Sequence, residues 1–242
     1  MIIQGRNAVT EAVKSAVTVE KVLLLKDAPK QNNFTLVKLC REKKITVQFV
    51  EKQALERLSP DGRHQGVIAV ATEFEYSDVE DVLQRQGDKP LLVLILDGIE
   101  DPHNLGAIIR VAECAGVNGI LLPRRRCCPV TDTAVKVSCG ASQYVKIAKV
   151  SNVNDAIRDL KERGIFVLAA DMGGADIYRT DLTGDLAIVI GGEGDGVHQL
   201  TAKLCDGKIA LPQFGQINSL NASVATGIVV YEAVRQREKY AK

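Results

Sequence analysis

Apolar residues in this chain recur with two different periods, and these periods predict alternating helices and strands. In the first third of the sequence, segments with helical spacing alternate with short runs rich in β-branched residues. The predicted helices are residues 7–16, 34–43 and 53–58, and the predicted strands are residues 19–25, 45–50 and 67–72. Together they predict a small α/β domain of about 75 residues, a length that can fold on its own.

The same alternation continues after residue 90 with longer apolar runs. Strands are predicted over residues 91–96, 119–122, 165–170, 187–191 and 208–211, and helices over 104–115, 131–139, 153–163, 197–205 and 221–239. Asn104 is the expected N-cap of the first of these helices. The pattern is typical of an α/β fold with a mostly parallel sheet that is covered by helices on both faces.

An acidic segment separates these two parts. Residues 76–90 contain few apolar clusters and end in Gly87-Asp88-Lys89-Pro90, so we interpret them as a linker, with a short helical turn expected over residues 79–83. The predicted organisation is therefore a small domain over residues 1–75, the linker, and a larger domain over residues 91–242.

Composition narrows the class of protein. The chain of 242 residues has 46% hydrophobic residues, enough for a sizeable core, but no apolar run of the length that spans a membrane. The first residues do not resemble a signal peptide, so we expect a cytoplasmic protein without a membrane partner. Six cysteines contain no Cys-x-x-Cys pair and only three histidines accompany them, so no metal site is expected.

The distribution of charge is more informative than its total. The net charge is only +1, which does not by itself indicate nucleic acid. However, residues 1–72 contain 12 Lys and Arg against 7 Asp and Glu, whereas residues 90–242 contain 17 of each kind. A basic N-terminal domain suits contact with phosphate, although an ordinary solvated surface would have the same composition.

Three polar turns follow predicted strands, where open α/β sheets bind ligands. The first, residues 97–104, leads into a helix that carries Arg110 in its second turn. The second, residues 191–196, contains four glycines, which allow a ligand to approach the backbone closely. It matches neither the dinucleotide-binding fingerprint nor the P-loop. The third, residues 211–221, places a serine and an asparagine before the last helix.

These three turns, in this order, resemble the motifs of the SpoU or TrmH-type family of RNA 2′-O-ribose methyltransferases. The matching segments are residues 97–110, 188–197 and 209–225. Residues 5–9 and 64–67 look like the accessory domain of the RlmB-like branch, which methylates guanosine in 23S rRNA. The resemblance covers nearly the whole chain. It implies S-adenosylmethionine as the cofactor, a C-terminal trefoil knot of the SPOUT type and a homodimer with active sites near the subunit interface.

The resemblance also implies roles for individual residues. The expected catalytic residues are Asn104, Arg110, Glu193, Ser219 and Asn221. The expected cofactor-binding residues are Ala170, Gly191, Glu193, Gly194, Leu211, Ser219 and Leu220. RNA contacts are expected from Arg6, His103, Arg124, Arg125 and Arg126, and no residue is expected to bind metal.

Two points about these roles stay open. The family assigns activation of the ribose hydroxyl to Arg110, but a guanidinium is effectively always protonated and is therefore a poor base. The easier physical account is that Arg110 binds a phosphate and stabilises developing alkoxide charge. In addition, Gln213-Phe214 stands where the family usually has methionine and a small residue, which affects the rim of the expected pocket.

Other functions remain compatible with parts of the sequence. Within the same chemistry, the substrate could be tRNA, or the chain could be a resistance-type rRNA methylase. A ribosome-assembly protein that binds RNA without catalysis is a second class, against which the complete set of motif residues argues. A nucleotide-dependent oxidoreductase is a third class, against which the absence of the dinucleotide fingerprint argues.

Overall fold

The computed structural model describes residues 1–14, 18–26, 30–59, 62–72, 74–85, 87–192, 194, 196–216 and 219–240. The chain divides into two compact units, Met1–Glu75 and Tyr76–Lys242, and each is considered by itself.

The first unit is a small sheet with helices. Its elements are β1 (Ile2–Gln4), α1 (Arg6–Lys14), β2 (Thr18–Leu25), α2 (Lys30–Glu42), β3 (Thr46–Val50), α3 (Lys52–Leu58) and β4 (Val67–Thr72). The strands lie in the order β1-β4-β2-β3, and β2 and β3 are parallel while β4 is antiparallel to both of its neighbours. The sequence did not predict β1, because its three residues are too few to show a period.

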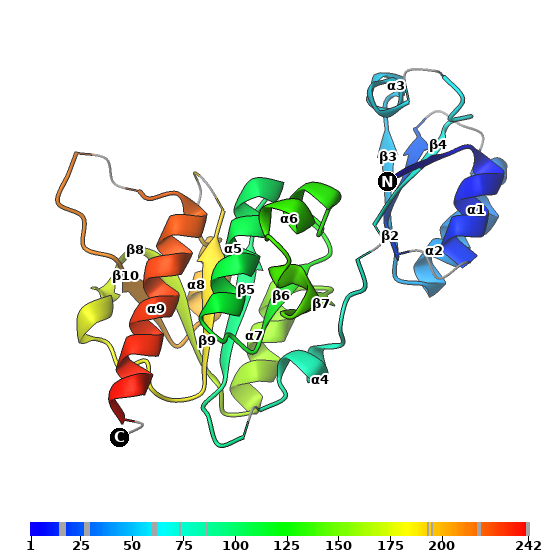
Figure 1. The fold of residues 1–242 in the computed structure, drawn as a ribbon. Helices are drawn as coiled ribbons and strands as arrows, with labels where there is room; N and C mark the ends of the chain where they lie inside the picture. Colours follow the sequence, from blue (N-terminus) through cyan, green and yellow to red (C-terminus); the bar gives the residue numbers. More distant parts are fainter. Residues whose placement is uncertain are drawn as a thin grey trace. The chain divides into compact units, whose positions relative to one another are not determined.

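The second unit contains a six-stranded parallel sheet (Figure 1). Its strands are β5 (Leu92–Asp97), β6 (Gly119–Pro123), β7 (Lys146–Val150), β8 (Phe166–Asp176), β9 (Leu186–Gly191) and β10 (Gly207–Ala210), in the spatial order β10-β8-β9-β5-β6-β7. All five strand pairings are parallel, which confirms the predicted sheet. Strand β7 was missed by the sequence prediction, since lysines interrupt its apolar positions.

Helices cover both faces of this sheet. They are α4 (Val79–Val82), α5 (Pro102–Cys114), α6 (Asp132–Val137), α7 (Val153–Glu162), α8 (Gln199–Leu204) and α9 (Ala222–Tyr240), with short 3-10 turns at Ala141–Gln143 and Ile177–Arg179. In Figure 1, α5 and α9 lie in front of the strands while α7 and α8 lie behind them. Because both faces are covered, every residue of β5 and of β9 is buried, which explains their uninterrupted apolar sequences.

The segment predicted as a linker instead packs on the second unit. Its helix α4 buries Val82 completely in the core beside α7. The backbone N–H of Ser77 donates to the carbonyl of Ile147, and the Tyr76 hydroxyl accepts from the N–H of Val130. Acidic residues surround a few apolar side chains here, so average composition suggested a linker although Val79, Val82 and Leu83 pack on the core.

Helix α5 begins two residues earlier than the sequence analysis predicted. Asp101 is the N-cap, and its carboxylate accepts a hydrogen bond from the N–H of His103. Pro102 occupies the first helical position, where its missing N–H costs nothing. Asn104 therefore does not cap the helix, and its side chain lies in the first turn, buried with 6% exposure. The side-chain amide of Asn104 therefore does not cap α5 and can contribute to a binding site.

The described residues contain neither a membrane-spanning helix nor a cluster of metal ligands. None of their helices is both long and apolar enough to cross a bilayer. No group of three or more His, Cys, Asp or Glu side chains in the same part of the chain is arranged to hold a metal ion.

Candidate functional site

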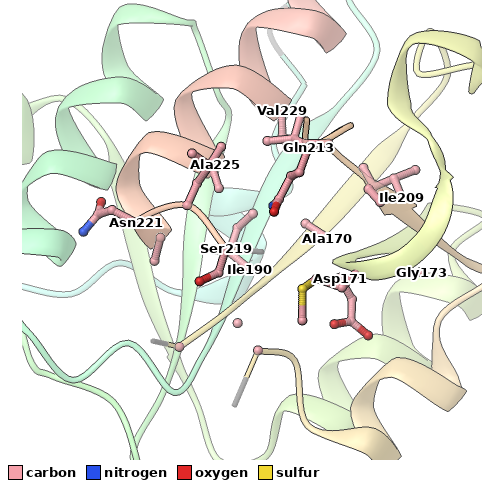
Figure 2. Close-up of a pocket in the computed structure, with 18 of the residues that line it drawn as sticks. Ala170, Asp171, Gly173, Ile190, Ile209, Gln213, Ser219, Asn221, Ala225 and Val229 are labelled. Carbon is pink, nitrogen blue, oxygen red and sulfur yellow. The ribbon is translucent and has the colours of Figure 1, made fainter. Parts of the chain in front are cut away.

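A cavity of ≈ 630 Å³ opens at the carboxyl ends of β8, β9 and β10. Its volume is within the range of small-molecule sites. Figure 2 shows residues from all three strand ends and from α9 converging on it. The apolar part of the lining includes Ile190, Ile209 and Val229, and the polar part includes Asp171 and Ser219. Such a mixture suits a ligand that has both an apolar and a charged portion.

One wall of the cavity comes from an irregularity in β8. Lys208 of β10 pairs with Ala169, but the next residue, Ile209, pairs with Ala175, so residues 170–174 leave the regular ladder. They bulge toward the cavity, and Ala170, Asp171, Met172 and Gly173 line it. The ammonium of Lys208 lies 2.6 Å from the Asp171 carboxylate and fixes the bulge at its polar end.

The glycine-rich turn after β9 forms the floor. A Cβ on Gly191 would lie 2.1 Å from the carbonyl carbon of Gly196, and one on Gly192 would lie 2.2 Å from the carbonyl oxygen of Gly98. Both contacts are with backbone, which cannot give way. Gly194 and Gly196 adopt positive φ angles of 93° and 64°. These glycines are therefore required by close packing of turns, and they leave backbone rather than side chains facing a ligand.

A hydrogen bond joins the first and third polar turns. The Nδ2 group of Asn221 donates to Oδ1 of Asn104 over 2.9 Å. In Figure 2 the Asn221 side chain points away from the centre of the cavity, consistent with this contact to α5. Its Oδ1 atom accepts from the backbone N–H groups of Ser223 and Val224, so Asn221 also caps α9. One side chain thus fixes the start of α9 and ties it to the buried amide of α5.

Most of the predicted site residues lie in or beside this cavity. It is lined by Ala170, Gly191, Gly194, Leu211, Ser219, Leu220 and Asn221, and Asn104 contacts it through Asn221. Glu193 lies outside the described residues. The sequence analysis placed Gln213 at the rim of the pocket, but it did not identify Asp171 and Met172 in the lining. Asp171 and Met172 follow the predicted strand end at residue 170, and that position is the signal that could have indicated them.

Arg110 does not line the cavity. Its Nη1 group is directed to the sulfur of Cys139 at 3.6 Å, and its side chain is exposed. Six residues separate Arg110 from Asn104, which places the two side chains about 120° apart around the helix. Arg110 shares its face with Gly106, which packs against Val137 of α6. The expectation that Arg110 and Asn104 share one site within a single chain is therefore not met in this structure.

The predicted RNA-contacting residues are dispersed. In the first unit, Arg6 donates to Oδ1 of Asn33 over 2.8 Å. In the second unit, His103 is exposed. Of the three consecutive arginines, Arg125 and Arg126 are exposed, whereas Arg124 is partly buried and its pKa is lowered by desolvation.

The groups around Arg124 form a partly buried cluster rather than an open basic surface. The Lys149 ammonium lies 4.4 Å from the centre of the Tyr76 ring. Burial lowers the pKa of Lys149 to about 8, and it raises the pKa of the Cys127 thiol to about 12. Desolvation also raises the pKa of Tyr76, which therefore stays neutral. Of the three consecutive arginines, Arg125 and Arg126 are therefore the exposed ones that an anion such as RNA phosphate can reach.

Comparison with known proteins identifies the family. Residues 91–231 match the model of the SpoU rRNA methylase family. Residues 2–77 match the model of an RNA 2′-O ribose methyltransferase substrate-binding domain. The TrmH family tRNA/rRNA methyltransferase of Staphylococcus haemolyticus is 42% identical over 243 residues, covering 99% of this chain and 97% of that protein. Its counterpart in Staphylococcus aureus strain COL is 42% identical over 240 residues, covering 98% and 96%.

Solved structures agree with this assignment. The SpoU methyltransferase AviRb of Streptomyces viridochromogenes, in complex with AdoMet, has a TM-score of 0.64 at 24% identity, covering 99% of this chain and 91% of that chain. The TrmH/SpoU tRNA-modifying enzyme of A. aeolicus has a TM-score of 0.58 at 31% identity, covering 66% and 81%. The match of both units shows that the chain belongs to the SpoU family of S-adenosylmethionine-dependent RNA 2′-O-ribose methyltransferases.

Proposed function

We propose that this chain transfers the methyl group of S-adenosylmethionine to the ribose 2′-hydroxyl of a guanosine in 23S rRNA. The observation that carries the proposal is that the second and third motif turns line one cavity and that the Asn221–Asn104 bond ties the helix after the first motif turn to it. The donor is a dipolar molecule with an apolar adenosine portion. Apolar groups such as Leu211 and Leu220 suit that portion, and the backbone of Gly191 and Gly194 in the lining offers hydrogen bonds.

Charge and domain content favour a large RNA as the substrate. The segment 1–72 is basic, and it lies within the part that matches a substrate-binding domain. The A. aeolicus tRNA-modifying enzyme matches 66% of this chain, a share close to that of the second unit alone. A separate basic unit is useful where phosphates far from the reacting ribose supply affinity. On this reading, Arg6 in the first unit and the exposed Arg125 and Arg126 in the second contact RNA phosphate.

Arg110 is proposed to act on the RNA rather than on the donor. It is a permanent cation that stands outside the cavity, so binding a phosphate next to the target ribose fits its position. There it would stabilise the charge that develops on the attacking oxygen. Glu193 is proposed to order the arginine or the RNA, as the family resemblance implies.

A homodimer and a knotted chain are part of the same proposal. Val224, Ile228 and Tyr231 recur along α9 at helical spacing and are 50%, 36% and 49% exposed. Such a row suits burial against a second copy. If the active sites lie near that interface, the exposed Arg110 of one subunit can reach the cavity of the other subunit. The second and third motif turns resemble the segments that form the trefoil knot in the family, so the knot is proposed to lie there.

Methyl transfer to RNA tests the reaction. Purified protein is incubated with labelled S-adenosylmethionine and with 23S rRNA or tRNA from a strain lacking the gene. We expect labelled 2′-O-methylguanosine in 23S rRNA and none in tRNA. Label in tRNA alone would overturn the substrate, and RNA binding without transfer to any RNA would favour a non-catalytic assembly protein.

Mixing of variants tests the dimer and the place of Arg110. Arg110→Ala and Asn221→Ala are each expected to be inactive as homodimers. If sites are shared between subunits, co-refolded mixtures recover about a quarter of the wild-type activity from heterodimers with one intact site. No recovery in mixtures that form heterodimers would place Arg110 and Asn221 at the same chain's site. Ile228→Glu is expected to give monomers by light scattering.

A further inference from the structure

A second cavity of ≈ 360 Å³ adjoins the first one. It lies at the carboxyl end of β5, and its lining includes Asn104. The two cavities share Gly192 and Gly196 in their linings, so they meet at glycine backbone that carries no side chain. If the methyl donor occupies the first cavity, as the proposed function requires, a nucleoside in the second cavity would meet it at this junction.

The second cavity contains a histidine–carboxylate pair. The ring Nδ1 of His198 lies 3.0 Å from Oδ2 of Asp97, and the same oxygen accepts the backbone N–H of His198 at 3.2 Å. Asp97 is the last residue of β5 and is buried, with its residue exposure at 7%. The His198 side chain is 43% exposed and lines the cavity. The carboxylate is thus fixed by the sheet, while the imidazole faces the open space.

The pairing determines which ring nitrogen is available. A carboxylate can only accept, so Nδ1 of His198 must carry the hydrogen in the neutral ring. Nε2 then holds a lone pair and can accept a proton. His64 in the first unit provides a contrast, because its Nδ1 accepts the N–H of Gly66 and its hydrogen must therefore be on Nε2. The structure consequently assigns opposite tautomers to two histidines of one chain.

The other charged groups of the second cavity are less suited to accepting a proton. Among the described residues they are Glu100 and Asp101, which precede α5, and Arg126, which follows β6. Asp101 is engaged as the N-cap of α5, and Glu100 is exposed to water. Arg126 is a permanent cation. Arg110 lines neither of the two cavities, so the motif arginine does not supply a base within one chain.

We propose that His198, oriented by Asp97, is the group that accepts the proton of the target ribose hydroxyl. This inference rests on the proposed function. The hydroxyl proton moves to Nε2 of His198 while the 2′-oxygen forms its bond to the methyl carbon. The bond from that carbon to sulfur breaks, and its electron pair stays on sulfur to give S-adenosylhomocysteine. The imidazolium then releases its proton to water, and the negative charge of Asp97 stabilises it in the interval.

The tautomer can be measured without any reaction. Two-bond ¹H–¹⁵N correlation spectra of protein labelled at its three histidines distinguish a protonated Nδ1 from a protonated Nε2. We expect the Nδ1–H form for His198 and the Nε2–H form for His64, with His198 losing its preference in Asp97→Asn. A protonated Nε2 on His198 in the neutral wild-type ring would overturn the proposal, because no lone pair would face the cavity.

Kinetics supply the second test. His198→Asn keeps an N–H donor near the Nδ1 position and removes Nε2, so the contact with Asp97 can persist. Single-turnover methyl transfer is expected to slow by about 100-fold or more, the usual range for losing a general base. Affinity for S-adenosylmethionine and RNA should change less than about threefold, well below the effect expected on rate.

A neighbouring variant serves as the control. Gln199→Ala changes the first residue of α8, which is exposed and lines neither cavity, and should keep the wild-type rate. A His198→Asn protein that folds and retains the wild-type rate would overturn the role of His198 while leaving the methyltransferase assignment intact. Wild-type protein that transfers methyl to no RNA would instead overturn the proposed function, and this inference with it.

Discussion

The bond between Asn221 and Asn104 gives the sharpest test of how the site is assembled. Asn221→Ala removes two contributions. Loss of the cap on the N–H groups of Ser223 and Val224 costs about 1 kcal/mol. Loss of the 2.9 Å bond to Asn104 costs about 0.5–1.5 kcal/mol. The sum is about 2 kcal/mol, which corresponds to a fall of about 4–8 °C in the midpoint of thermal unfolding for a unit of this size.

Two further variants separate these contributions. Asn221→Ser keeps a capping oxygen but is too short to reach Asn104, so it should lose only about 1 kcal/mol. The double variant with Asn104→Ala closes a cycle, and the coupling energy should be about 0.5–1.5 kcal/mol.

Unfolding is followed calorimetrically with and without S-adenosylmethionine, since the transition that the ligand raises belongs to the unit that binds it. Additive effects within about 0.3 kcal/mol would refute the reasoning, because the two asparagines would then not be coupled.

Three other outcomes follow from the structure. Gly191→Ala places a methyl group 2.1 Å from backbone and should weaken S-adenosylmethionine binding at least tenfold by calorimetry, whereas Gly184→Ala, with no atom within 4 Å, should not. For Lys149, whose pKa burial lowers from 10.5 to about 8, the unfolded chain binds more protons than the folded one between these values, so stability rises with pH there. Lys149→Met should therefore raise the unfolding free energy at pH 7 by about 2 kcal/mol, and its advantage in urea titrations should shrink toward pH 10. Limited alkylation followed by mass spectrometry should modify the exposed Cys139 well before Cys127, whose thiol pKa is about 12; equal rates would contradict the burial of Cys127.

Much of the fold could be predicted because local patterns were consistent with the tertiary structure. The fully apolar runs at 91–96 and 187–191 can only be strands buried on both faces, and they became β5 and β9. Prediction failed where a short or mixed segment depends on its neighbours. Strand β7 has lysines at positions 146 and 149 among its apolar residues, so it does not stand out from the sequence. The helical turn at α4 was expected, but its packing on the core was not, because α4 holds a single fully buried side chain.

The candidate site was predictable to the extent that it consists of turns. Motif resemblance placed Gly191, Ser219 and Leu220 at a cavity, and the structure agrees because the ends of parallel strands meet at one edge of the sheet. Asp171 could not be found in this way, since the register shift between β8 and β10 that moves it into the cavity leaves no local pattern.

By itself the sequence determined the class of fold, the order of its elements and the family, because these depend on periodicity and on motifs that are contiguous in the chain. Only the tertiary structure decided how side chains are directed. It turned Arg110 toward Cys139, joined Asn104 to Asn221 across 117 positions, and set His198 against Asp97. Helix phase, strand order and the packing of one turn on another determine such directions, and none of these is encoded within a single segment of the chain.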